Sequence, residues 1–414
     1  MISRLLALTA AVSLAAAGAR ADNWPEFRGP TGQGVYKGTL PLEWGPGRNV
    51  AWKQAVPGRG WSSPVVWEGR VYLTTAVPVD GAPGELSLDA LALDARSGKP
   101  LWQTAVFRQP ATAPRIQAKN SHASPTPIVD GRRLYVHFGH QGTACLDLDG
   151  KVRWRNTELK YPPVHGNGGS PILAGELLVF SCDGGSDPFV AALERGTGKV
   201  RWKVPRGIDA FKSFSFSTPL LIEVNGAKQI VSPGSDAVMA YEPATGKEIW
   251  RVGYPGGYSV IPRPVHGHGL VFVCTGYESP RLLAIRPDGR GDVTATHVAW
   301  RARQGVPHTP SLLLDGDELY MVSDAGFASC LDARTGREHW RKRLPGAYSA
   351  SPLLAGGRVY FQNEAGTGVV VRAGKEYKEL ARNALDERTL ASYAAADGAL
   401  FIRTDRHLYR IEGR

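Results

Sequence analysis

A phrase of about ten residues recurs along the chain and constrains its fold more than any other feature. The copy at 331–340 reads LDARTGREHW, with a Thr335-Gly336 turn before Trp340. Glycine adopts the positive φ that such turns require, so the phrase predicts strand, tight turn, strand. Further copies, one of them stretched to 285–300, end at Trp102, Trp154, Trp202, Trp250 and Trp300. These tryptophans are 40 to 52 residues apart, a spacing typical of repeat architectures.

Each repeat unit has the same order of signals. An apolar run, a glycine turn and a second apolar run come first, followed by a longer loop, a third strand and the phrase that ends in tryptophan. Asp130-Gly131 and Asn225-Gly226 are examples of the first turn, and such pairs between apolar runs indicate β-hairpins. Four short antiparallel strands per unit are the composition of a propeller blade.

The number of blades follows from the incomplete units at the two ends of the chain. Seven units begin between Trp61 and Tyr348, and an eighth at 391–412 has only three strands. An isolated strand at 49–56, with Trp52 in the motif position, can supply the fourth. Joining them closes the ring and removes free strand edges. We therefore predict an all-β, eight-bladed β-propeller of four-stranded antiparallel blades, closed by N- and C-terminal strands in one blade.

The chain divides into three segments. Residues 1–21 combine Arg4, a short apolar run and a small-residue site around Ala19 to Ala21, which predicts a cleaved signal peptide and a periplasmic or secreted protein. Residues 22–48 are rich in proline, glycine and aromatic residues, so we expect them to pack on the body without long regular elements. Residues 49–414 are the predicted propeller.

The repeated D-x-x-[TS]-G-[KR]-x-x-W resembles the tryptophan-docking motif of the PQQ-like (pyrroloquinoline quinone repeat) β-propeller superfamily. The opening WPEFRGPTGQG at 24–34 is similar to that of a secreted bacterial branch of the superfamily. The resemblance covers nearly the whole chain after residue 21. It implies a propeller in which the motif tryptophans pack between blades, and relatives that include quinoprotein dehydrogenases and a lipoprotein of the outer-membrane assembly machine. A shared fold does not by itself imply a shared chemistry.

Strand alternation places the short turns on one face and the long loops on the other. The loops between blades and those between second and third strands share the second face, where chemically rich residues do not repeat, and function tends to lie in such loops. We expect them to line a central cup that binds a polar or anionic small molecule. The candidate ligand-binding residues are Trp61, His122, His165, Asn167, Asp183, Lys212, Arg263, His308 and Tyr348. Each also has a purely structural interpretation, as a hydrogen-bonded spacer or turn residue.

The resemblance implies PQQ as a cofactor, held on the axis with a calcium ion, a catalytic aspartate and, in many members, adjacent half-cystines. Cys145, Cys182, Cys274 and Cys330 are far apart and read as isolated buried thiols. The three histidines of the candidate set lie on different blades, so we expect no metal site. PQQ is therefore implied by family resemblance and not supported by site residues, and the cofactor is left unassigned.

The formal charge of +11 comes from scattered basic residues. Because no basic stripe or nucleic-acid module is present, we expect no nucleic-acid partner. We expect no membrane span, and a monomer.

Two functions fit the sequence, and no complete catalytic constellation decides between them. The first is a binding or scaffold protein that holds a small polar ligand or a protein partner at the central cup. The alternative is a quinoprotein-type oxidoreductase. A third, an assembly-machine subunit, is weakened because no cysteine stands near residue 21 to carry a lipid anchor.

Overall fold

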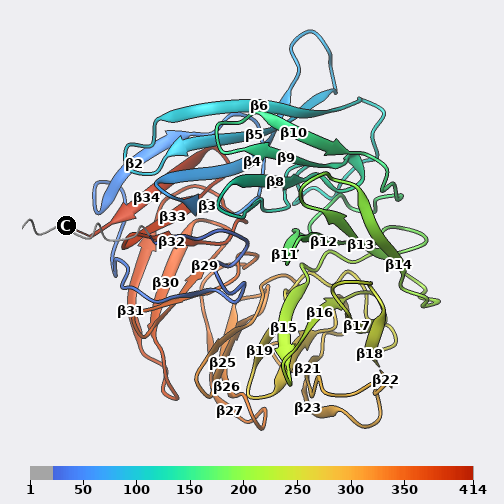
Figure 1. Ribbon diagram of the computed structural model, residues 1–414. Coiled ribbons are helices and arrows are strands. Elements are labelled where there is room, and N and C mark those ends of the chain that lie inside the picture. The colour runs from blue at the N-terminus through green and yellow to red at the C-terminus, as the bar shows by residue number, and fades with distance from the viewer. Residues whose placement is uncertain (1–21, 414) are drawn as a thin grey trace, which may run out of the picture.

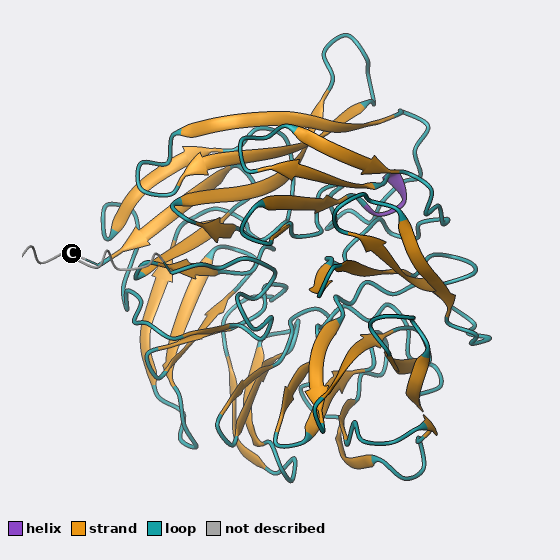
Figure 2. Cartoon of the chain, viewed as in Figure 1, coloured by secondary structure: helices purple, strands orange, loops and turns teal. Residues whose placement is uncertain are grey.

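The computed structural model describes residues 22–413, which form eight sheets, each built on four antiparallel strands and set as a blade around a central axis (Figure 1). The predicted eight-bladed propeller is confirmed. The described chain is almost entirely strand and loop, with one short 3₁₀ helix, η1 (Gly139–Gln141) (Figure 2). Within this part of the chain no helix has the length and apolar character needed to cross a membrane. The predicted signal peptide, residues 1–21, lies outside the described residues.

Blades 1 to 4 follow the chain in order, and each runs from an inner first strand to an outer fourth strand. Their strands are β3 (Val65–Trp67), β4 (Arg70–Pro78), β5 (Leu86–Asp94) and β6 (Pro100–Gln109); β7 (Ile128–Val129), β8 (Arg133–His137), β9 (Thr143–Asp147) and β10 (Val152–Asn156); β11 (Ile172–Ala174), β12 (Leu177–Cys182), β13 (Phe189–Glu194) and β14 (Val200–Pro205); and β15 (Leu220–Val224), β16 (Ala227–Pro233), β17 (Ala237–Tyr241) and β18 (Glu248–Gly253).

Blades 5 to 8 repeat this order. Their strands are β19 (Val265–Gly267), β20 (Leu270–Cys274), β21 (Leu282–Ile285) and β23 (Val298–Ala302); β24 (Leu313–Asp315), β25 (Glu318–Val322), β26 (Phe327–Asp332) and β27 (Glu338–Arg343); β28 (Leu353–Ala355), β29 (Arg358–Gln362), β30 (Thr367–Arg372) and β31 (Glu379–Ala384); and β32 (Ala394–Ala396), β33 (Ala399–Arg403), β34 (His407–Glu412) and β2 (Val50–Ala55).

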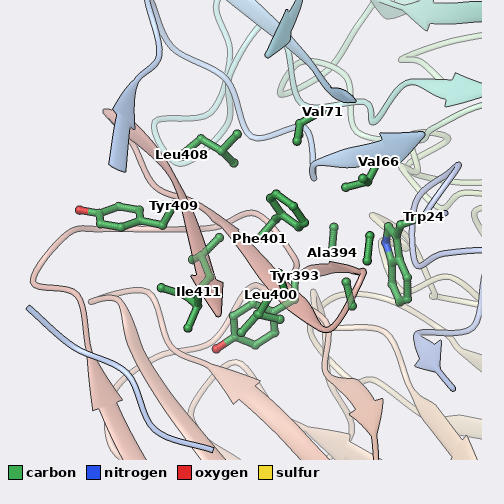
Figure 3. Close-up of a cluster of buried hydrophobic side chains, with 14 of the residues drawn as sticks. Trp24, Val66, Val71, Tyr393, Ala394, Leu400, Phe401, Leu408, Tyr409 and Ile411 are labelled. Atoms are coloured by element: carbon green, nitrogen blue, oxygen red, sulfur yellow. The ribbon is translucent and has the colours of Figure 1, made fainter. Parts of the chain in front are cut away.

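The ring closes in blade 8 through a strand from each end of the chain. β2 pairs antiparallel with β34, with Lys53 opposite Tyr409, and Figure 1 shows blue β2 beside red β34. A hydrophobic cluster lies next to this closure (Figure 3), where Phe401 of blade 8, Val66 of blade 1 and Trp24 of the N-terminal segment are each about 1% exposed. The ring is closed here by strand pairing and not by a continuous chain. Burial of apolar surface at this seam therefore stabilises the closure.

The motif tryptophans pack between consecutive blades, as expected. The indole nitrogen of Trp154 in blade 2 donates to the carbonyl of Arg195 in blade 3 at 3.0 Å. A Cβ on Gly198, in the turn of blade 3, would lie 2.5 Å from the Trp154 ring. The same close approach joins Trp52 to Gly98, Trp102 to Gly150, Trp202 to Gly246 and Trp300 to Gly336. The turn glycine thus provides both the positive φ and the space for the neighbouring ring.

Blade 5 departs from this pattern because its phrase is stretched and lacks the Thr-Gly turn. Trp250 of blade 4 is fully buried and donates to Gln229 of its own blade at 2.8 Å. The inserted residues form β22 (Gly291–Asp292), which pairs parallel with the outer strand β18 of blade 4. The insertion therefore covers part of an outer edge that the other blades leave open.

The N-terminal segment crosses the axis on the side of the short turns. Its β1 (Val35–Tyr36) pairs parallel with β28 of blade 7. It also accepts or donates hydrogen bonds at Val66, Val129, Arg263, His266 and Gly398, in blades 1, 2, 5 and 8. Phe27 reaches the floor of the cavity on the opposite face, so this segment closes the axial opening from below.

Candidate functional site

A cavity of about 910 Å³ lies on the long-loop face, at the axis. We call it the cup. Each of the eight interblade loops contributes to its wall, through Trp61, Asn120, His165, Lys212, Tyr258, His308, Ser349 and Leu390. The short turns line a separate groove between blades 3 and 4, where Gly175 of a first hairpin meets Thr197 of a motif turn. The long loops therefore gather at one site, as strand alternation predicts.

A ring of hydroxyl groups surrounds the lower part of the cup. At seven blade boundaries a backbone N–H donates to the Ser or Thr hydroxyl of the next blade, at 2.9 to 3.2 Å. The hydroxyls belong to Ser63, Thr126, Ser170, Thr218, Ser311, Ser351 and Ser392, and all seven residues line the cavity. The ring ties adjacent blades together by satisfying backbone groups at strand starts.

Arg263 occupies the eighth position of this ring and has a different structural role. Its side chain is 2% exposed, and its guanidinium donates to the backbone carbonyl of Phe27 at 2.6 Å and lies 3.4 Å from the Glu26 carboxylate. Burial lowers the pKa of Arg263, and Glu26 opposes that shift. Arg263 therefore anchors the N-terminal segment beneath the cup and does not line it.

Four of the predicted site residues do line the cup, namely Trp61, His165, Lys212 and His308. Lys212 donates to the Tyr258 hydroxyl at 2.8 Å, its ammonium lies 4.0 Å from the centre of that ring, and Tyr258 donates to Glu278 at 2.5 Å. The hydrogen bond with Tyr258 raises the pKa of Lys212. The lysine is therefore a cation already engaged by an aromatic face and a carboxylate.

Two of the remaining predicted residues are held by structural hydrogen bonds. Asp183 forms a bidentate pair with Arg206, at 2.6 and 2.7 Å, and both side chains are at most 1% exposed. Burial alone would lower the pKa of Arg206, but the Asp183 carboxylate outweighs it and raises the pKa. The Asn167 side chain bridges two loops, because it accepts from Tyr161 at 2.9 Å and donates to the Phe138 carbonyl at 3.2 Å.

His122 and Tyr348 also lie outside the wall of the cup. His122 is half-buried with Nε2 3.3 Å from the Gln109 amide nitrogen, and burial, followed by the charge of Arg59, lowers its pKa. Tyr348 is fully buried in the hydrophobic cluster between blades 6 and 7. Because side chains alternate along the extended loop, its neighbour Ser349 lines the cup instead.

Aromatic residues outside the predicted set line much of the cup. They are Phe27, Phe214, Phe216, Tyr258 and Tyr277. Phe214, Phe216 and Tyr258 share loops with predicted residues, so the repeat pattern places them on the same face. No repeat signal relates Phe27 and the N-terminal segment to the axis.

The family model described as outer membrane protein assembly factor BamB matches residues 46–180, 88–214, 186–291 and 289–400, which together span most of the propeller. The chain belongs to this family. A relative within it, the BamB of Burkholderia pseudomallei, is 25% identical over 316 residues, which are 72% of each protein. The narrower placement in a secreted branch stays a prediction.

Solved structures of two kinds share the fold. BamB from Moraxella catarrhalis aligns with a TM-score of 0.59 and 11% identity, over 87% of this chain and 99% of that one. The quinohemoprotein alcohol dehydrogenase ADHIIG from Pseudomonas putida HK5 aligns with a TM-score of 0.56 and 14% identity, over 95% of this chain and 81% of that one. At such identities the likeness shows the fold and no activity.

The residues of the cup do not fit PQQ, the cofactor that the family resemblance implies. PQQ carries several carboxylates, but Lys119 and Lys212 are already matched by Glu364 and Glu278. Among residues 22–413 no group of three or more His, Cys, Asp or Glu side chains is arranged to hold a metal ion. All four cysteines are single, buried and free, which confirms the expectation of isolated thiols.

Proposed function

We propose that this protein is a binding or scaffold propeller whose cup holds a small polar ligand or a segment of a protein partner. A relative is named as an assembly factor and a structural neighbour as an alcohol dehydrogenase, so the fold alone does not choose between the two roles. The observation that carries the proposal is the convergence of all eight interblade loops, with non-repeating side chains, on one cavity of about 910 Å³. This volume lies within the range of small-molecule sites, roughly 300–1,000 Å³.

The roles of the chain segments, the location and the oligomeric state are proposed from the sequence. Residues 1–21 are proposed as a signal peptide, residues 22–48 as a segment that closes the cup from below, and residues 49–414 as the binding propeller. A periplasmic or secreted monomer without a nucleic-acid partner is part of this proposal, in line with a family described by an outer-membrane assembly factor.

The binding role predicts that cup substitutions abolish ligand-dependent stabilisation. The purified chain from residue 22 would be screened by thermal shift against polar metabolites, sugars, organic acids and short peptides. A ligand that binds only the folded state raises Tm with concentration. We expect at least one class to do so for the natural protein and not for the double variant His165→Ala, Lys212→Ala, since both residues line the cup.

Lys228→Ala and Lys247→Ala in the groove between blades 3 and 4 are the matched control. They remove cations from the opposite face and should leave every shift unchanged. A Tm shift that persists in the cup variant and disappears in the groove variant would move the site to the short-turn face. If no class shifts the natural protein, the binding role is wrong.

A further inference from the structure

The cup has a continuous arc of aromatic rings on the side of blades 3 to 6. His165 and Phe214 lie 5.2 Å apart between ring centres, Phe214 and Tyr258 5.7 Å, Tyr258 and Tyr277 6.0 Å, and Tyr277 and His308 5.2 Å, all edge to face. An edge-to-face contact covers one face of one ring in each pair. Ring faces along the arc therefore remain for a ligand.

The rim of this arc leaves large aromatic side chains in solvent. Tyr277 is 51% exposed, and Phe211, in the loop of Lys212, is 94% exposed. Aromatic side chains bury large areas when they find a partner, and apolar surface that gathers around a cavity marks a binding site. Because Tyr277 belongs to the arc, lines the cup and is half-exposed, the arc reaches solvent at this point.

The rest of the wall is rich in uncharged hydrogen-bonding groups. Gln117, Asn120, Ser124 and Ser349 lie around the cup, above the ring of seven hydroxyls. Each ring hydroxyl accepts one backbone N–H, and that bond leaves the proton of the hydroxyl free to donate. Above the ring, Ser124 donates to Asn120 at 2.6 Å and Ser349 donates to Glu364 at 2.7 Å. The wall of the cup is therefore polar but largely uncharged at these positions.

The charges in the cup are matched locally. Lys119 lies 2.6 Å from the Glu364 carboxylate, and Lys212 lies 3.6 Å from Glu278. A carboxylate oxygen of Asp324 accepts the backbone N–H groups of His308 and Thr309, at 2.7 and 3.2 Å. A strongly charged ligand would have to displace one of these partners, whereas a neutral ligand would not.

We propose that the ligand of the cup is a neutral oligosaccharide, an inference that rests on the binding role proposed above. A pyranose ring has apolar C–H faces that pack on aromatic rings, and hydroxyls around its edge that both donate and accept. It carries no charge to neutralise. The three properties match the aromatic arc, the ring of hydroxyls and the paired charges respectively. A peptide that binds by adding a strand fits less well, because that mode needs a free strand edge, and the cup is walled by loops.

The probes are neutral pentasaccharides of glucose, xylose, mannose and N-acetylglucosamine, tested by calorimetry against the whole chain from residue 22. We expect at least one to bind, and Tyr277→Ala to weaken it at least about tenfold, or about 1.4 kcal/mol. Tyr277 is half-exposed, so its loss should leave Tm nearly unchanged. Phe327→Ala is the matched control, since Phe327 is 42% exposed but packs on Arg343 of an outer strand.

The salt dependence of binding distinguishes a neutral ligand from a charged one. Binding should change little between 50 and 500 mM NaCl, roughly the range over which paired-charge contacts are screened. If sugars fail while an organic acid or peptide gives a cup-dependent Tm shift, the saccharide inference is overturned and the binding role stands. If nothing binds the cup, both fall. Equal loss of affinity in Tyr277→Ala and Phe327→Ala would also overturn the aromatic arc as the contact surface.

Discussion

At the level of single residues, several buried arginines help to hold this propeller together. Arg28, Arg206, Arg263 and Arg403 are among its largest fully buried side chains. Arg403 donates to the backbone carbonyls of Ser62 and Thr74, at 3.1 and 2.9 Å. Burying a guanidinium is costly unless it is paired or hydrogen-bonded, so such residues tie loops to one another. This explains why Arg263 and Asp183, which look like ligand groups in the sequence, are structural.

Glu387 is the clearest case at the ring closure and leads to a pH prediction. Its side chain is 5% exposed and contacts Lys53 of β2 at 2.7 Å. It also accepts hydrogen bonds from Thr404, His407 and Tyr409, at 2.7 to 2.9 Å. Burial alone would raise the pKa of Glu387, but these partners outweigh it and lower the pKa from 4.5 to about 2.

A carboxylate with a depressed pKa stabilises the folded state above its unfolded pKa, and that contribution is lost as pH falls toward the folded value. We therefore expect Glu387→Gln to lower Tm at pH 7, and the difference from the natural protein to narrow between about pH 4.5 and pH 2. Thermal melts across this range measure it. Glu379→Gln, which removes a partly exposed pair with Arg382, should show little effect. A pH-independent Tm difference for Glu387→Gln would contradict the assignment.

Among strands and turns, the contact between a tryptophan and the turn glycine of the next blade is the recurring unit. The packing effect of a substitution at this glycine can be separated from the effect of backbone strain, because blade 3 has two glycines with similar φ. Gly198 has a φ of 73° and faces the Trp154 ring, whereas Gly175 has a φ of 63° and no atom near its Cβ position. The two positions therefore differ in packing but have similar φ.

We expect Gly198→Ala to lower the free energy of unfolding by about 1–3 kcal/mol more than Gly175→Ala, because only the first overpacks a blade seam. Urea denaturation of both variants measures the difference. Both substitutions share the cost of alanine at positive φ, which therefore cancels. Equal destabilisation would mean that the seam relaxes freely around the extra methyl group.

For the molecule as a whole, stability depends on closure by the N-terminal residues. β2 supplies the outer strand of blade 8, and the residues before it close the axial opening. Without them, β34 would be a free edge next to an exposed hydrophobic cluster. Such an edge pairs with other chains.

A chain that begins at residue 57 should therefore aggregate or fail to refold, and a synthetic peptide of residues 22–56 should restore a monomer in size-exclusion chromatography. A chain that begins at residue 49 keeps β2 and serves as the control for the axial segment. It should fold with a lower Tm, since Arg263 loses Glu26 and the carbonyl of Phe27. Full stability of the chain from residue 57 would show that ring closure contributes little.

The sequence by itself determined the architecture. The repeated phrase ending in tryptophan indicates strand order and turn type from local residue chemistry, and the number of its repeats indicates the number of blades. It also sorted the loops onto two faces, since strand alternation depends on connectivity alone. It placed Trp61, His165, Lys212 and His308 near the axis for the same reason.

Only the tertiary structure decided which side chains face the cup and which are buried beside it. The direction in which a loop side chain points depends on the φ and ψ angles of the few residues around it. Tyr348 therefore lies in the core and Ser349 in the cup. The N-terminal segment has no repeat, so its path across the axis and the place of Phe27 come from contacts more than 200 residues apart in sequence. The aromatic arc arises in the same way, because its rings meet across loops of four blades.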